Sequence, residues 1–169
     1  MRGTAGRRAD PRRSDAGADH GGGDGFRDGI AGNADVKIIA SQNADWLREK
    51  AIPVSQAMFQ ANPTIDAVYG HNDRMAEAAI ISAQNSNKDL GKMLFVGIDA
   101  LPTPDGGIKS VMDGRLGVTY VYPTGGAQAI DWATKILEQN EKPPKEVVLE
   151  TEEVTKANAA DEYKKFGGK

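Results

Sequence analysis

The stretch MLFVGID, residues 93–99, decides the fold. Residues 93–98 form the most strongly apolar run in the chain, and β-branched Val96 and Ile98 favour an extended backbone. The run predicts a central strand that is buried on both faces, as in a parallel sheet. Asp99 follows directly, so this strand ends at a carboxylate.

Strand and helix patterns alternate on both sides of this run. Short apolar runs that predict strands lie at residues 36–40, 67–70, 117–121 and 147–149. The segments between them repeat apolar residues at helical spacing; in the first, Leu47, Ala51, Val54, Met58 and Ala61 predict one buried face, with Asn43 or Asp45 as the cap. This alternation indicates an α/β fold, with an open parallel sheet and helices on both faces.

The first 25 residues differ in composition from the rest. They contain no Val, Ile, Leu, Phe, Tyr or Trp, so we expect a disordered Gly/Arg-rich segment. Gly, Ala, Arg, Pro and Asp share GC-rich codons, which raises the alternative of an out-of-frame start. Residues 26–155 then form a partial α/β lobe, and residues 156–169 form a C-terminal tail with a short helix at 157–166.

Composition excludes several classes of function. The 169 residues carry a formal net charge of −3, which argues against nucleic acid as a partner. The chain has no cysteine, so disulfides and thiolate metal sites are excluded. No apolar run approaches the roughly 20 residues of a membrane helix, and we expect no signal peptide in this chain.

Polar and aromatic residues follow the predicted strands. In an open parallel sheet, ligands bind at the carboxyl ends of the strands. The candidate ligand-binding residues there are Trp46, Asn72, Asp73, Asp99 and Tyr122. Carboxylates and amides pair with sugar hydroxyls, and an aromatic ring packs on the C–H face of a sugar, so the pattern predicts a polyhydroxylated ligand.

Each candidate also has a structural interpretation. Asn72 and Asp73 are good helix caps. Trp46 is also explained as a core residue, and Tyr122 as a filler at the end of a strand. Asp99, which is harder to explain as a cap, carries the functional interpretation best.

Catalysis has less support in the sequence. The chain contains no Gly-x-Ser-x-Gly, Walker A or Gly-x-Gly-x-x-Gly motif. The pattern of His71 with Asp73 and Asp99 is too unspecific to indicate a metal. We therefore expect no enzyme, cofactor or metal, and a small hydrolase that uses His71 with Asp73 or Asp99 is the third hypothesis.

Three motifs resemble one family. Residues 70–76 (GHNDRMA), 95–102 (FVGIDALP) and 118–123 (VTYVYP) resemble the C-terminal half of ribose-type sugar-binding proteins. These are type I periplasmic binding proteins, the solute receptors of bacterial ABC importers. The resemblance implies a sugar ligand, a membrane permease as partner and a periplasmic or cell-surface location. LacI-type regulators share the fold, so an effector domain is the second hypothesis, although residues 1–35 offer no helix-turn-helix.

The resemblance also implies residue roles. Asn72 matches the amide that bonds sugar hydroxyls, and Asp99 matches the carboxylate that accepts from two of them. Trp46 lies where the family places an aromatic ring, whereas Tyr122 stands where relatives often have Gln. A ligand Arg usual before the position of Gly25 is absent here.

The chain departs from the family pattern in one larger respect. We expect it to lack the N-terminal lobe and the first strands of the second lobe. It should therefore bind sugar weakly or not at all, and it should expose apolar surface where the missing parts would pack.

Overall fold

The computed structural model describes residues 17–168, which fall into two units, one up to Lys37 and one from Ile38 onward. In the first unit, α1 spans Gly17–Ile30. It includes residues 17–25, where the sequence predicted disorder; residues 1–16 of that prediction lie outside the described part of the chain. The fold that carries the candidate site belongs to the second unit.

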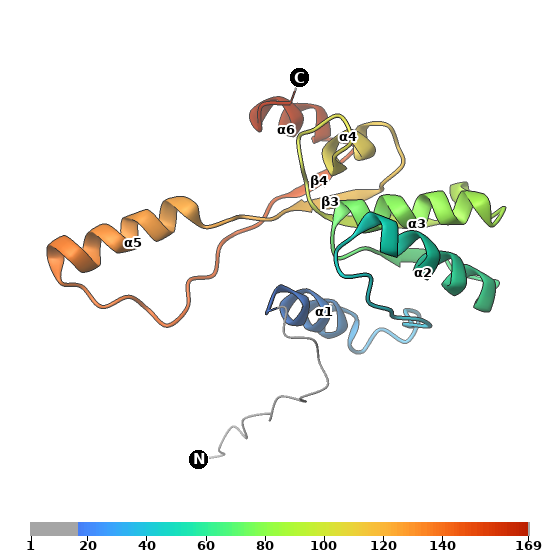
Figure 1. Cartoon of the computed structure of the whole chain (residues 1–169), viewed down its shortest axis with the longest axis horizontal. Helices are drawn as coiled ribbons and strands as arrows, with labels where there is room; N and C mark the ends of the chain where they lie inside the picture. Colours follow the sequence, from blue (N-terminus) through green and yellow to red (C-terminus); the bar gives the residue numbers. More distant parts are fainter. Residues whose placement is uncertain (1–16, 169) are drawn as a thin grey trace, which may run out of the picture. The chain divides into compact units, whose positions relative to one another are not determined.

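The second unit alternates helices and strands over most of its length (Figure 1). Its elements are α2 (Arg48–Ala61), β1 (Ala67–Tyr69), α3 (Asp73–Asn85), the 3-10 turn η1 (Leu90–Lys92), β2 (Leu94–Asp99), α4 (Gly107–Met112), β3 (Val118–Val121), α5 (Gly126–Gln139), β4 (Glu153–Thr155) and α6 (Ala159–Lys165). The strand predicted from MLFVGID is β2.

The four strands form one open sheet in the order β1-β2-β3-β4. β2 pairs in parallel with β1 and with β3, so that Val96 faces Tyr69 on one side and Val118 on the other. This confirms the α/β class and the mostly parallel sheet. The last strand differs from the expectation, because β4 is antiparallel to β3 and begins at Glu153.

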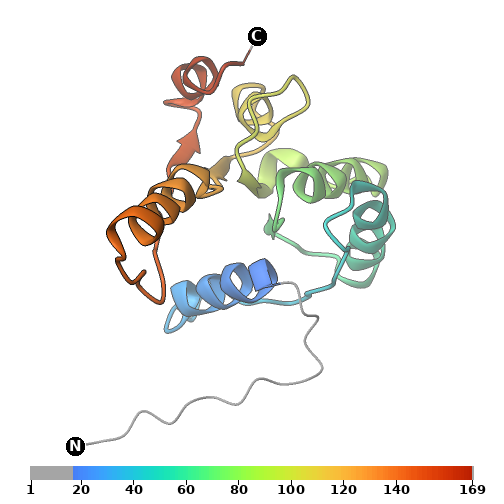
Figure 2. The same cartoon turned by 60° about the vertical axis from the view of Figure 1, so that its left-hand side comes forward.

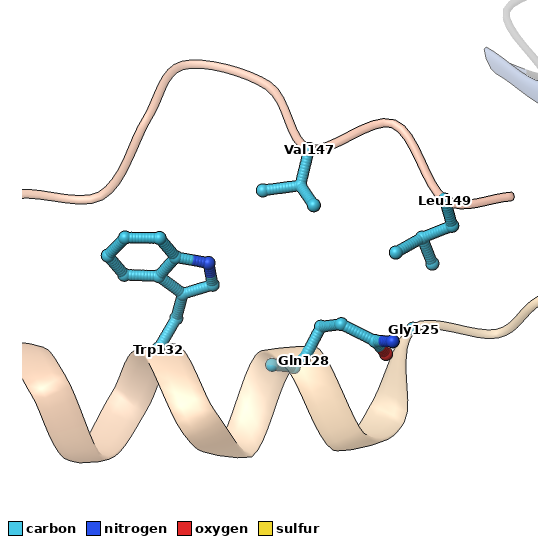
Figure 3. Close-up of a pocket in the computed structure, with 6 residues that line it drawn as sticks. Gly125, Gln128, Trp132, Val147 and Leu149 are labelled. Carbon is cyan, nitrogen blue, oxygen red and sulfur yellow. The ribbon is translucent and has the colours of Figure 1, made fainter.

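Two predicted strands are absent from the sheet. Residues 36–40 have no regular structure, and Val36, Ile38 and Ile39 are 43–54% exposed. Residues 147–149 are also irregular, and Val147 and Leu149 line a hollow beside α5 instead (Figure 3). An apolar run forms a strand only when a neighbouring strand makes hydrogen bonds with its backbone N–H and C=O groups. Neither of these two runs is paired in the sheet.

One face of the sheet carries the core. Phe95, Gly97, Thr119 and Val154 are buried, whereas Val96 between the first two is half-buried. The helices that contact this sheet are α3, α4 and α6, and α2 lies beside α3 (Figures 1 and 2). These three helices contribute side chains to the same core.

Two helices differ in detail from the sequence pattern. The buried residues of α2 are Ala51, Ser55 and Phe59, while Leu47 is 41% exposed and caps the helix without a side-chain hydrogen bond. The buried face therefore differs from the predicted one by a rotation about the helix axis. Ser55 lies in the interface with α3, where its hydroxyl donates to the Ser82 hydroxyl at 2.8 Å. Ala159 of α6 is buried in the core, so the segment predicted as a tail belongs to the fold.

Candidate functional site

The carboxyl ends of the parallel strands place three of the predicted residues along one edge of the sheet, and a fourth, Trp46, lies in the loop before α2. Asp99 ends β2, Asn72 follows β1, and Tyr122 follows β3. The Tyr122 amide lies 3.5 Å from the Asp99 carbonyl oxygen, and the Asn72 amide group reaches the loop that holds Trp46. We call Trp46, Asn72, Asp99 and Tyr122 the rim.

Asn72 is held by two hydrogen bonds. Its Oδ1 accepts from the Met75 amide at 2.8 Å, which caps α3 as the sequence predicted, and its Nδ2 donates to the Trp46 carbonyl oxygen at 3.1 Å. Gly70 lets the chain enter the helix closely, because a Cβ there would lie 2.7 Å from the Ala76 amide. One N–H and one lone pair of the Asn72 side chain remain for another partner.

Trp46 belongs to an aromatic cluster on this edge. Asp45 and Trp46 adopt left-handed backbone conformations, with φ values of 50° and 63°. The half-buried Trp46 ring meets the His71 ring edge-on at 6.2 Å, and His71 lies 5.0 Å from the Tyr69 ring. The three rings form an aromatic cluster beside Asn72.

Asp99 is half-buried at the end of β2. Burial raises the pKa of its carboxyl group, and the nearby Arg74 guanidinium opposes that rise. Arg74 lies on the first turn of α3 and pairs loosely with Asp105, at 3.9 Å. Sequence reasoning missed Arg74; the signal was its position two residues after Asn72, on the helix turn that starts at this edge.

Asp73 lies beneath the rim. Its side chain is 1% exposed, and its oxygens accept from the Thr119 hydroxyl at 2.6 Å and from the Leu101 amide at 3.4 Å. Burial raises its pKa to about 6, the Thr119 hydroxyl opposes the rise, and the charge of Asp99 adds to it. The sequence grouped Asp73 with the ligand contacts, but in the structure its oxygens bond groups inside the protein.

Tyr122 is the most open of these side chains, at 55% exposed. Its backbone is tied to Asp99, so it stays on the same edge, beyond the end of β3. The structure thus joins Asn72 to Trp46, and Tyr122 to Asp99, along this edge.

Two hollows lie away from the rim. One, of about 240 Å³, lies between α5 and residues 147–149 and is lined by Trp132, Val147 and Leu149 together with the polar Gln128 (Figure 3). The other, of about 410 Å³, lies along α2 beside Ala40 and Gln42. Neither hollow is lined by a rim residue.

Residues 17–168 contain neither a metal-binding cluster nor a membrane-spanning helix. No group of three or more acidic, histidine or cysteine side chains lies close enough to hold a metal ion. No helix in the same range has the length and apolar character needed to cross a membrane.

Comparison with known sequences identifies what the chain is similar to. The protein family described as "Periplasmic binding protein domain" matches residues 15–142 of this chain. The ribose import binding protein RbsB of Salmonella typhimurium is 36% identical over 117 residues, which are 68% of this chain and 38% of that protein. The D-allose-binding periplasmic protein of Escherichia coli is 45% identical over 67 residues, 40% of this chain and 21% of that one.

A solved structure gives the same result. The fructose-binding periplasmic domain of a hybrid two-component system matches with a TM-score of 0.76 and 38% identity, over 83% of this chain and 46% of that chain. The chain therefore spans less than half the length of these three relatives.

Proposed function

The chain belongs to the periplasmic binding protein domain family, and on that premise we propose that its rim binds a monosaccharide or related polyol without catalysis. The wider role that we propose is that of the solute-binding component of a bacterial ABC importer, acting in the periplasm or at the cell surface. Its membrane partner would be the permease of that importer.

The observation that supports this proposal best is the meeting of an amide, a carboxylate and an aromatic ring at one sheet edge. The Asn72 side chain bonds the Trp46 carbonyl oxygen at 3.1 Å, and the next residue bonds the Leu101 amide, two residues after Asp99. A sugar hydroxyl both donates and accepts, so it can use the spare N–H of Asn72 and the oxygens of Asp99. The Trp46 ring offers a face for the sugar C–H groups.

The match to only 38% of the ribose import binding protein leads us to expect weak binding by residues 1–169 alone. A sugar bound with a Kd of 1 μM has about −8.2 kcal/mol of binding free energy. A site that makes two or three fewer hydrogen bonds than such a complex loses roughly 0.5–1.5 kcal/mol for each. The loss of one stacked aromatic ring costs a similar amount, so that the Kd shifts towards millimolar. The relatives are more than twice as long as the matched segment, which is consistent with a second contact surface in them.

Calorimetry with D-ribose, D-allose and D-fructose, extended into the millimolar range, tests the proposal. We expect binding of at least one sugar and its loss in Asp99→Ala. The matched control is Asp66→Ala, an exposed carboxylate that precedes β1 and so lies at the opposite edge of the sheet. Binding that survives Asp99→Ala, or that Asp66→Ala weakens as much, contradicts the proposal.

A further inference from the structure

We propose that Asp73 is a positioning residue: its buried carboxylate holds the turn that begins at Asp99 and so fixes where the rim presents the Asp99 side chain. The importance of Asp99 rests on the proposed function above. The contact between the Asp73 carboxylate and the turn is a property of the fold, and its effect on Asp99 can be measured without any sugar.

Asp73 connects three elements through its two oxygens. Oδ1 accepts from the Thr119 hydroxyl of β3 at 2.6 Å, and Oδ2 accepts from the Leu101 amide, in the turn after β2, at 3.4 Å. Thr119 is fully buried and Asp73 is 1% exposed, so water does not compete for these bonds. The carboxylate therefore ties the start of α3 both to β3 and to the turn.

The turn needs such a tie because its backbone is strained. Asp99 has a φ of 111° and Ala100 a φ of 51°, and non-glycine residues rarely adopt such values. Strained residues persist only when their surroundings hold them. Ala100 is buried at 3% exposure, and the next amide, that of Leu101, donates to Asp73.

Glycines shape the space around the carboxylate. A Cβ on Gly97 of β2 or on Gly107 of α4 would overlap the oxygens of Asp73. A Cβ on Gly106 would overlap the Leu101 carbonyl oxygen, so the start of α4 also packs against the turn. The backbones of β2 and α4 thus close around a carboxylate at this position.

The charged and polar groups near Asp73 determine the pH at which its carboxyl group ionises. From the turn, Asp99 faces it and disfavours its ionised form, while Thr119 from β3 and the backbone amides of the turn favour that form. Gly107 brings backbone only from α4. On α3, Arg74 acts on Asp99, and Glu77 is engaged by Ser110 and Arg115. The pKa of Asp73 is raised to about 6, so its titration falls within an accessible range.

Carboxyl-carbon NMR of the whole chain, recorded from pH 3 to pH 8 without sugar, tests the proposal. In the wild type, the Asp99 signal should show its own titration and a second step near pH 6, when Asp73 ionises. In Asp73→Asn, the second step should disappear while the titration of Asp99 itself remains, and the Asp99–Leu101 amide signals should shift. The control Asp66→Asn should change none of these.

A second variant covers the case in which Asp73→Asn fails to fold. Thr119→Val removes the hydroxyl donor but keeps the carboxylate, so the second step should move to higher pH, and Thr119→Ser should move it back. An unchanged Asp99 curve in folded Asp73→Asn, or an unmoved step in Thr119→Val, overturns the proposal. Because no sugar is present, a failure of sugar binding leaves this result intact, and the reverse also holds.

Discussion

Replacing Asp73 by Asn should change how the stability of the fold depends on pH. In the folded chain, burial raises the pKa of Asp73 from 3.8 to about 6. The folded state therefore holds this proton more tightly than the unfolded state does, and stability falls as pH rises from about 4 to about 6 and is flat above that. A difference of about two pKa units corresponds to roughly 2–3 kcal/mol. Because the side chain is 1% exposed, solvent screening reduces this figure little.

Urea unfolding of the wild type and of Asp73→Asn at pH 4 and pH 7.5 measures this effect. Exposed carboxyl groups whose pKa is lowered, such as those of Asp45 and Asp113, lose their contribution as pH falls, but they do so equally in both proteins. The difference between the two free energies of unfolding cancels them. Between pH 4 and pH 7.5, the wild type should lose about 2–3 kcal/mol of stability relative to Asp73→Asn. Parallel pH curves for the two proteins would refute the reasoning.

Two further predictions concern packing. Gly107→Ala should destabilise the fold by about 1–3 kcal/mol, because its Cβ would overlap the Asp73 carboxylate, whereas Gly126→Ala meets open space and should change urea unfolding little. Leu137→Glu should leave the free energy of unfolding within about 0.5 kcal/mol, because Leu137 is 83% exposed on α5, which has no buried residue. The same variant should reduce binding of an apolar dye and self-association in light scattering; unchanged values would show that α5 is not the exposed apolar surface.

Much of the fold was predictable because local patterns decided it. The MLFVGID run is β2, and Gly114, with a φ of 75°, follows the end of α4, where a glycine favours the end of a helix. The runs at 36–40 and 147–149 looked equally strand-like, but a strand requires a pairing neighbour, which the run itself does not specify. The antiparallel β4 at 153–155 depends on pairing with β3, from which α5 and its return segment separate it in the sequence (Figure 1).

The candidate site divides in the same way. The rule that ligands lie at the carboxyl ends of strands placed Asn72 and Asp99 on one edge. The depth of Asp73 could not be predicted, because it depends on Thr119, which is 46 residues away, and on glycines in two other elements. Asp73 is suited to cap a helix, to contact a ligand or to make buried hydrogen bonds. Only its partners elsewhere in the sequence decide which of these roles it has.

The two tryptophans provide the most direct test that the rim is the sugar site. Trp46 belongs to the rim, and Trp132 lines the apolar hollow beside α5 (Figure 3). Titration of the ¹⁵N-labelled chain with D-ribose, D-allose and D-fructose should shift the Trp46 indole, the Asn72 side-chain amide and the Asp99 amide together, with one saturation curve. Shifts confined to the Trp132 indole, with Trp46 and Asn72 unmoved at saturation, would contradict it.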